Sequence, residues 1–305
     1  MSIDELSLQF QLKKLSFEQT AIYFHNEDCL RFLNFLRRQR EIEYLYLAFS
    51  RGLSPIFNIA LFEMKNVTTL EVRFLNESLS DLFLNLKKCN QSVAKLKYVD
   101  LMKKHFKDDH AQKFLSFLPN LTQLDFFSIY NITNGRFMKM LGETLQQLKV
   151  LKLRNLISGE FTSLKFVQLQ NLFLDGCSIT AHEWHILLNN GTCMKELILD
   201  RSYINQEILN VIIQKAPNLE SLEFRTGFYT PDLMSLQKLK KLKVLRVDKK
   251  MEDLLKKQNF EFNIEFVSQK FVNYLGQFEE IFKQFPLDSS LCHVVWILCF
   301  TEDLN

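Results

Sequence analysis

The chain has 305 residues, of which 47% are hydrophobic and 24% are charged, and its formal net charge is +3. This is the composition of a globular protein with enough apolar residues for a large core. A charge this mild, with basic and acidic residues intermixed, does not indicate a nucleic-acid-binding protein. The eight Gly and five Pro residues leave little room for long loops, so we expect closely connected elements.

The N-terminal stretch MSIDELSLQFQLKKL lacks the basic segment and apolar core of a signal peptide. The most apolar run, LCHVVWILCF at 291–300, has ten residues, whereas a membrane helix needs about 20. Six cysteines without paired spacing favour free thiols in a reducing compartment. Six Asn-x-Ser/Thr sequons would suit a secreted protein, but we attribute them to chance. We therefore expect an intracellular protein, cytoplasmic or nuclear, without membrane contact.

One apolar pattern, apolar-x-x-apolar-x-apolar, recurs along most of the chain. From Ile42 to Leu242 its copies are 21 to 28 residues apart, which is the spacing of a leucine-rich repeat. In such a unit a short strand turns its apolar residues inward, and the residue between them faces solvent. The first residues of the ten copies are Leu12, Ile42, Val67, Val93, Leu121, Leu148, Leu169, Met194, Leu219 and Leu242.

The segments between these strands predict return helices, since parallel strands need a crossover connection. Apolar residues at three- and four-residue spacing predict helices over 26–39, 54–64, 78–89 and 205–218, the last stopped by Pro217. A Thr180–Glu183 capping box predicts another helix from Ala181. The return at 157–168 is too short for a full helix, so we expect the curvature to change there.

These elements predict an α/β fold, a right-handed leucine-rich repeat solenoid of about ten units shaped as a horseshoe. Its parallel sheet is expected on the concave side and its helices on the convex side. We assign residues 1–250 to the solenoid. Because a solenoid exposes core at its ends, we assign 251–305 to a helical C-terminal capping segment, in which FVSQKFVNYLGQFEEIFKQF predicts an amphipathic helix.

Residues 172–199, LFLDGCSITAHEWHILLNNGTCMKELIL, contain four side chains of zinc-ligand type, Cys177, His182, His185 and Cys193. Tetrahedral zinc needs its four ligands to converge. In the repeat interpretation the cysteines stand at opposite ends of one return, and the histidines share a helix with core residues. We therefore expect no metal there. Asp108 and Asp109 of HFKDDH are expected at a helix start rather than at a metal.

The same stretch resembles the cysteine-containing subclass of leucine-rich repeats, whose units read Leu-x-Leu-x-x-Cys-x-Ile-Thr before a helix. The entries FLPNLTQLDF and QKAPNLESLEF look similar, with Leu118 or Ala216 where that subclass often has Cys. This resemblance covers roughly 10–250 and implies a substrate receptor of an F-box-type ubiquitin ligase. Because the first repeat begins near Leu12, we expect no F-box here. The chain is then a fragment or divergent relative of such a receptor, or it recognises proteins without recruiting a ligase.

No phosphate-binding glycine loop, zinc-protease helix or nucleophile elbow occurs in the chain. Cys292 and His293 are adjacent, and neighbours in a strand point to opposite faces, so we expect them in the core rather than in a catalytic pair. We therefore predict a non-enzyme without a cofactor, and a recognition scaffold or, alternatively, a constitutive subunit of a large assembly.

The solvent-facing strand positions predict where a partner protein would bind. Neighbours on adjacent strands touch, so Glu71, Lys97, Asp125 and Lys152 are expected to pair with each other, as are Glu223 and Arg246. Phe173 and Ile198 are apolar at this position, and we expect nothing from the same chain to cover them. A cation from the partner would relieve repulsion between the neighbours Asp175 and Asp200. The full candidate face is Tyr46, Phe49, Phe74, Phe127, Arg154, Phe173, Asp175, Ile198, Asp200 and Arg225.

Overall fold

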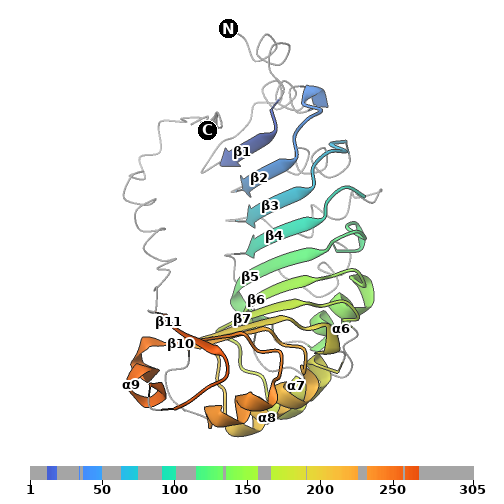
Figure 1. The fold of residues 1–305 in the computed structure, drawn as a ribbon. Coiled ribbons are helices and arrows are strands. Elements are labelled where there is room, and N and C mark those ends of the chain that lie inside the picture. Colours follow the sequence, from blue (N-terminus) through green and yellow to red (C-terminus); the bar gives the residue numbers. More distant parts are fainter. Residues whose placement is uncertain are drawn as a thin grey trace.

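The computed structural model describes residues 12–18, 34, 37–49, 63–74, 91–100, 115–132, 135–156, 166–189, 191–225, 232–256 and 258–267. In these ranges, eleven strands form one sheet in which each strand pairs in parallel with its neighbours in chain order (Figure 1). The strands are β1 Lys14–Glu18, β2 Tyr44–Phe49, β3 Thr69–Phe74, β4 Lys95–Asp100, β5 Gln123–Ile132, β6 Val150–Leu156, β7 Asn171–Asp175, β8 Glu196–Asp200, β9 Ser221–Arg225, β10 Val244–Asp248 and β11 Asn263–Val267.

The register of the sheet aligns the apolar positions of successive repeats. Leu172 of β7 lies opposite Leu197 of β8, and Leu174 lies opposite Leu199. All four side chains are at most 1% exposed, because the repeat turns them toward the neighbouring coils. The alternation of the strand leaves the residue between them on the other face of the sheet. The predicted leucine-rich repeat solenoid is confirmed.

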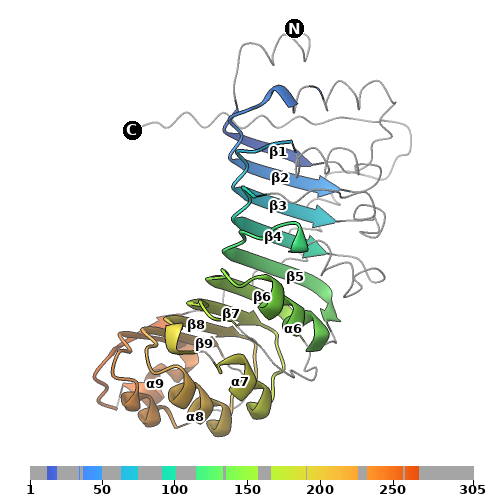
Figure 2. The same cartoon turned by 90° about the vertical axis from the view of Figure 1, so that its right-hand side faces the viewer.

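Helices connect several of the strands and lie along the outer side of the curved row, with the sheet on the inner side (Figures 1 and 2). They are α6 Gly135–Thr144, α7 Ala181–Leu187, α8 Gln206–Lys215 and α9 Glu252–Leu255, with short 3₁₀ helices η1 Gly191–Cys193, η2 Leu233–Lys238 and η3 Lys249–Met251. None of the described helices is long and apolar enough to cross a membrane. The predicted helix over 78–89, and most of those over 26–39 and 54–64, lie outside the described residues.

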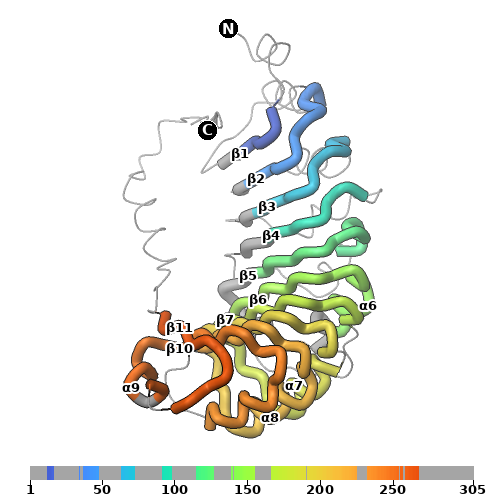
Figure 3. The backbone as a smooth tube through the Cα atoms, viewed as in Figure 1, coloured from blue at the N-terminus to red at the C-terminus, as the bar shows by residue number. Residues whose placement is uncertain are grey.

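The predicted start of one helix, α7, and the predicted end of another, α8, are confirmed. Thr180 Oγ1 accepts a hydrogen bond from the Glu183 amide at 3.3 Å, and a Glu183 carboxylate oxygen accepts one from the Thr180 amide at 2.8 Å. This reciprocal capping box begins α7 at Ala181. Helix α8 ends at Lys215, two residues before Pro217. Successive coils stack closely, as Figure 3 shows for the backbone between β7 and β10.

The sheet does not end at the expected boundary after residue 250. Strand β11 pairs with β10 over five residues, with Ile264 opposite Leu245 and Phe266 opposite Val247. In the described residues after 250, helical structure is confined to the end of η3 and the single turn α9. Residues 263–267, within the segment assigned to a helical cap, therefore extend the sheet, and the division of the chain at residue 250 stays a prediction. Residues 268–305, including the predicted amphipathic helix, lie outside the described residues.

The row of strands changes direction along its length. Figure 2 shows β1–β5 stacked along one line and the later strands turning away from it. The register between β5 and β6 is interrupted there, since Phe127 pairs with Arg154 but Ile132 pairs with Leu156. Extra residues in one strand of a pair bend it and increase its twist. The short return at 157–168, where we expected a change of curvature, lies mostly outside the described residues.

Candidate functional site

The solvent-facing strand positions form continuous rows on the inner side of the sheet. We call the row between the two buried strand residues the central row, and from Tyr46 to Arg246 it consists of the residues that the repeat pattern predicts to face solvent between two buried ones. A flanking row lies two residues before it and another two residues after it. The central row is Ser16, Tyr46, Glu71, Lys97, Asp125, Lys152, Phe173, Ile198, Glu223, Arg246 and Glu265.

Phe173 and Ile198 stand side by side in the central row, as predicted. Both are half-buried. Part of the cover comes from Arg154, whose guanidinium carbon lies 5.5 Å from the centre of the Phe173 ring. The expectation that nothing from the same chain covers this pair is therefore wrong for Phe173. A cation over an aromatic face is attracted to it and holds it in place.

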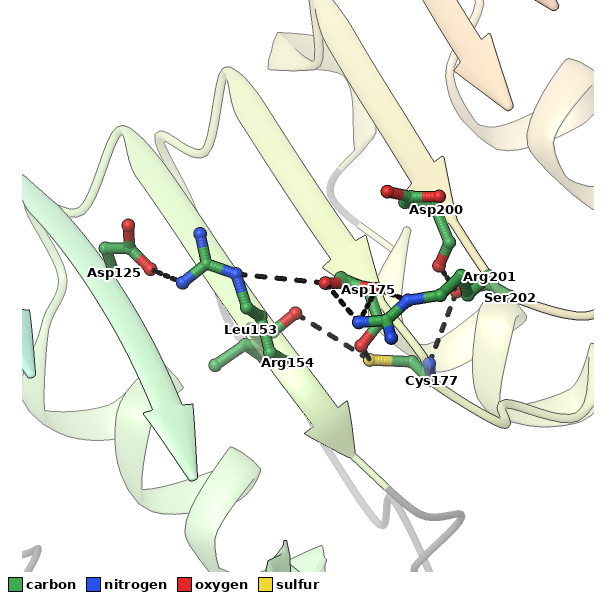
Figure 4. A network of polar contacts seen from close by, with 8 residues as sticks. All are labelled: Asp125, Leu153, Arg154, Asp175, Cys177, Asp200, Arg201 and Ser202. Atoms are coloured by element: carbon green, nitrogen blue, oxygen red, sulfur yellow. Dashed lines mark hydrogen bonds and ion pairs between the residues drawn. The ribbon is translucent and has the colours of Figure 1, made fainter. Parts of the chain in front are cut away.

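The same arginine belongs to a chain of ion pairs that crosses four repeats (Figure 4). Arg154 Nη1 donates to Asp125 at 2.8 Å, and its Nε lies 3.9 Å from Asp175. Arg201 donates from Nε and Nη2 to the two oxygens of Asp175, each at 2.7 Å. The Asp175 side chain is only 6% exposed. Asp175 is therefore already paired with arginines of this chain, and the predicted relief by a partner's cation stays a prediction for Asp200.

Arg201 reaches Asp175 from a turn that requires an unusual backbone. Its φ is 48°, in the left-handed region, and Gly176 at the equivalent place of the preceding repeat has a φ of 62°. The Gly176 amide donates to the Asp200 carbonyl at 2.8 Å, and the Cys177 amide donates to the Ser202 hydroxyl at 3.3 Å. Sequence reasoning missed Arg201. The equivalence with Gly176 is the signal that could have identified this turn.

At the other end of the face, Tyr44 and Lys97 both hold Glu71. The Tyr44 hydroxyl donates to Glu71 at 2.9 Å, and Lys97 Nζ lies 2.7 Å from the same carboxylate. Burial and this hydrogen bond raise the pKa of the Tyr44 hydroxyl. Tyr46, the predicted site residue beside Glu71 in the central row, is half-buried. The predicted pairing of Glu71 with Lys97 is confirmed, but Asp125 pairs with Arg154.

The three predicted phenylalanines do not share one row. Phe49 lies opposite Phe74, whereas Phe127 lies opposite Val99 and Arg154, one residue out of line with that pair. The spacing from the central row is three residues for Phe49 and Phe74 and two for Phe127, so the three do not form one row. Arg225 lies opposite Asp200, as expected. The side chains of Phe49, Phe74, Phe127 and Arg225 lie outside the described part of the structure.

The four zinc-ligand-type residues fall into different surroundings. The Cys177 thiol is 3% exposed and donates to the carbonyls of Asp175 at 3.5 Å and Leu153 at 3.8 Å. Cys193, His182 and His185 are exposed. Among the described residues, no three His, Cys, Asp or Glu side chains are grouped so that they could hold a metal ion.

Three comparisons with known proteins bear on this arrangement. No protein-family model matches the chain, and no curated protein matches it. Among solved structures, the chain is similar to a leucine-rich repeat protein of Leptospira interrogans, with 17% identity and a TM-score of 0.42. The match covers 76% of this chain and 62% of the Leptospira chain. The repeat fold of this chain rests on its own eleven parallel strands and their aligned leucines.

Proposed function

We propose that this chain is a non-catalytic protein-recognition scaffold that binds its partner on the inner face of the sheet, centred on Phe173 and Ile198. The observation that carries the proposal is the position of this apolar pair in an otherwise polar row. Large apolar side chains on a surface bordered by charge are typical of protein-binding sites, and aromatic residues supply much of the affinity there.

The ion pairs around Phe173 support a preorganised surface. Arg154 is held by Asp125 on one side and by Asp175 on the other, and it packs over the Phe173 ring. Arg154 is only 12% exposed, so this contact fixes the aromatic ring without a partner. A side chain that is already ordered loses less entropy when a partner binds, which favours affinity.

The finer form of this proposal is a receptor that resembles the substrate-binding repeats of F-box-type ubiquitin ligases. It rests on the Cys177-containing unit, in which the thiol is buried at the turn after β7 and contacts the carbonyl of Leu153 in the preceding repeat. Binding of an adaptor of the ligase requires an F-box. An intracellular location is part of the same proposal and rests on the sequence.

The alternative is a constitutive subunit whose inner face is permanently covered in a large assembly. The half-buried state of Phe173 and Ile198 suits both functions, since either partner would complete the burial. The two differ in stoichiometry and lifetime. A receptor releases its partner, whereas a subunit is recovered in a fixed ratio with the same proteins.

Affinity purification from native cells tests this proposal. The wild-type chain is compared with a Phe173→Ala/Ile198→Ala double variant and with Tyr203→Ala, an exposed aromatic residue outside the rows, which is 57% exposed. We expect at least one protein to be retained by the wild type and Tyr203→Ala but lost from the double variant. A cullin and its adaptor among the retained proteins would support the receptor, and a fixed complex the subunit. Equal recovery with all three chains would contradict the proposed face.

A further inference from the structure

The charged side chains on the inner face are divided between its two ends. On β1–β6 the three solvent-facing rows hold five described basic side chains, Lys14, Lys95, Lys97, Lys152 and Arg154, against Glu71 and Asp125. On β7–β11 the same rows hold six described acidic side chains, Asp175, Glu196, Asp200, Glu223, Asp248 and Glu265, against Arg246. Three of the six, Asp175, Glu223 and Asp248, are buried, and the other three are partly exposed. The described charges therefore give a net +3 at the first end and −5 at the second, which becomes −4 when Arg201 is included.

Local pairing does not remove this division. At the first end, Lys97 pairs with Glu71 at 2.7 Å and Arg154 pairs with Asp125 at 2.8 Å. Both described acidic groups of that end are paired in this way, and the described basic side chains still outnumber them. Lys95 and Lys152, which contribute to it, are exposed.

At the second end, the acidic side chains outnumber the arginines that pair with them. Arg246 lies 2.7 Å from Glu265, and Arg201 lies 2.6 Å from Asp175. Arg225 of β9, opposite Asp200, is a third arginine of this end, and three arginines against six carboxylates still leave the excess negative.

The apolar pair lies where the two ends meet. In the central row, Phe173 is opposite Lys152 on β6, and Ile198 is opposite Glu223 on β9. The row therefore reads, over four adjacent strands, basic, aromatic, aliphatic and acidic. A partner that covers the apolar pair is flanked by opposite charges on its two sides.

We propose that the inner face binds an extended segment of a partner protein that lies across the strands and is itself divided in charge. The segment places an apolar side chain on Phe173 and Ile198, acidic residues over β1–β6 and basic residues over β7–β11. This inference rests on the proposed function and adds the chemistry and the orientation of the partner.

Because the two ends are far apart, each end attracts or repels only the charges of the partner that lie close to it. Strands are about 4.8 Å apart, so the centres of the two ends are separated by roughly five spacings, or about 25 Å. Charges are screened over about 8 Å at physiological ionic strength. A uniformly charged partner is attracted at one end and repelled at the other, whereas a divided partner is attracted at both. An extended chain covers about 3.3 Å per residue, so its acidic and basic groups should be centred about eight residues apart.

Three synthetic peptides of about 17 residues provide the probe. They share a central Leu-Phe pair and carry acidic and basic flanks, two acidic flanks, or two basic flanks. Binding to the full chain is measured by fluorescence anisotropy at low salt. We expect the divided peptide to bind about 10-fold more tightly than either uniform peptide, and this preference to shrink as salt is added.

Charge-neutralising variants locate the effect. Lys95→Gln/Lys152→Gln and Glu196→Gln/Asp200→Asn should each weaken the divided peptide about 5-fold. The first pair should improve binding of the uniformly basic peptide, and the second that of the uniformly acidic one. Lys139→Gln/Glu207→Gln, which changes exposed residues of α6 and α8 on the outer side, should change neither.

The outcomes distinguish this inference from the function on which it rests. If Phe173→Ala abolishes binding but the three peptides bind equally, the apolar site stands and the divided partner is wrong. If a uniformly charged peptide binds most tightly, the inference is also overturned. If none of the peptides binds, or Phe173→Ala binds as the wild type does, both the inference and the proposed face are contradicted.

Discussion

Arg201 holds both carboxylate oxygens of Asp175 at 2.7 Å from a backbone φ of 48°, in a region that residues other than Gly rarely adopt. The ion pair and the backbone thus act in opposite directions on stability. A left-handed backbone costs a non-Gly residue about 1–2 kcal/mol, and a charge-assisted bidentate contact to a nearly buried carboxylate offsets that cost.

Two substitutions at this position separate the two effects. Arg201→Ala loses the ion pair and keeps the backbone cost, so we expect a loss of about 1–3 kcal/mol of unfolding free energy. Arg201→Gly loses the same ion pair but accepts the backbone, so it should be more stable than Arg201→Ala by about 1 kcal/mol. Urea denaturation measures both. Equal stability of the two variants would mean that the φ of Arg201 carries no cost.

Phe173 and its neighbour Leu172 point to opposite faces of strand β7, so alanine substitutions at the two positions can be compared directly. Leu172 is 1% exposed, so Leu172→Ala should cost about 2–5 kcal/mol of stability. Phe173 faces the inner surface, where its internal contact is with Arg154, and Phe173→Ala should cost about 1 kcal/mol or less. Thermal unfolding of both variants checks this. If Phe173→Ala unfolds as readily as Leu172→Ala, Phe173 belongs to the core and the proposed face is in the wrong place.

Gly191 packs against the end of the next helix more closely than any other residue type allows. A Cβ added there would lie 2.6 Å from the carbonyl oxygen of Lys215, which is backbone and cannot move aside easily. We expect Gly191→Ala to cost about 1–3 kcal/mol, since the two coils must separate to admit the methyl group. Thr192→Ala, at the exposed neighbouring position, is the control and should change the melting temperature little.

Much of this fold follows from the sequence because a single physical requirement repeats in every unit. Each strand must bury two apolar residues, so Leu172 and Leu174 predict the register of their neighbours in the next repeat. The eleventh strand escaped the pattern because Glu261 stands where the other repeats have their first apolar residue, although Ile264 and Phe266 keep the other two.

The candidate site was predicted less completely, because side chains reach across repeats in ways that spacing does not reveal. The adjacency of Phe173 and Ile198 follows from the repeat and is found. Arg154 packs over Phe173 while it pairs with acidic residues on both sides, and Arg201 acts from a turn rather than from a strand. These are long-range choices among rotamers, and a one-dimensional pattern does not contain them.

The Tyr44 hydroxyl predicts how stability responds to alkaline pH. Burial and the hydrogen bond to Glu71 raise its pKa in the folded chain above the value of about 10 in the unfolded chain. The unfolded state therefore releases this proton first, and the contribution of Tyr44, full below pH of about 10, is lost as the pH rises further. In urea melts at several alkaline pH values, Tyr44→Phe should flatten this fall. An unchanged slope would show that Tyr44 titrates at its ordinary value.

The last prediction concerns the cysteines and histidines of residues 177–193. The Cys177 thiol is buried and donates to two backbone carbonyls, whereas Cys193, His182 and His185 are exposed. Purified protein should therefore contain no stoichiometric zinc by elemental analysis. Cys177→Ser should lower stability by about 1 kcal/mol, because a buried hydroxyl requires a well-formed hydrogen bond more than a thiol does. One zinc per chain, lost on His182→Ala, would show instead that this stretch binds a metal and that the repeat packing of Cys177 is only part of its role.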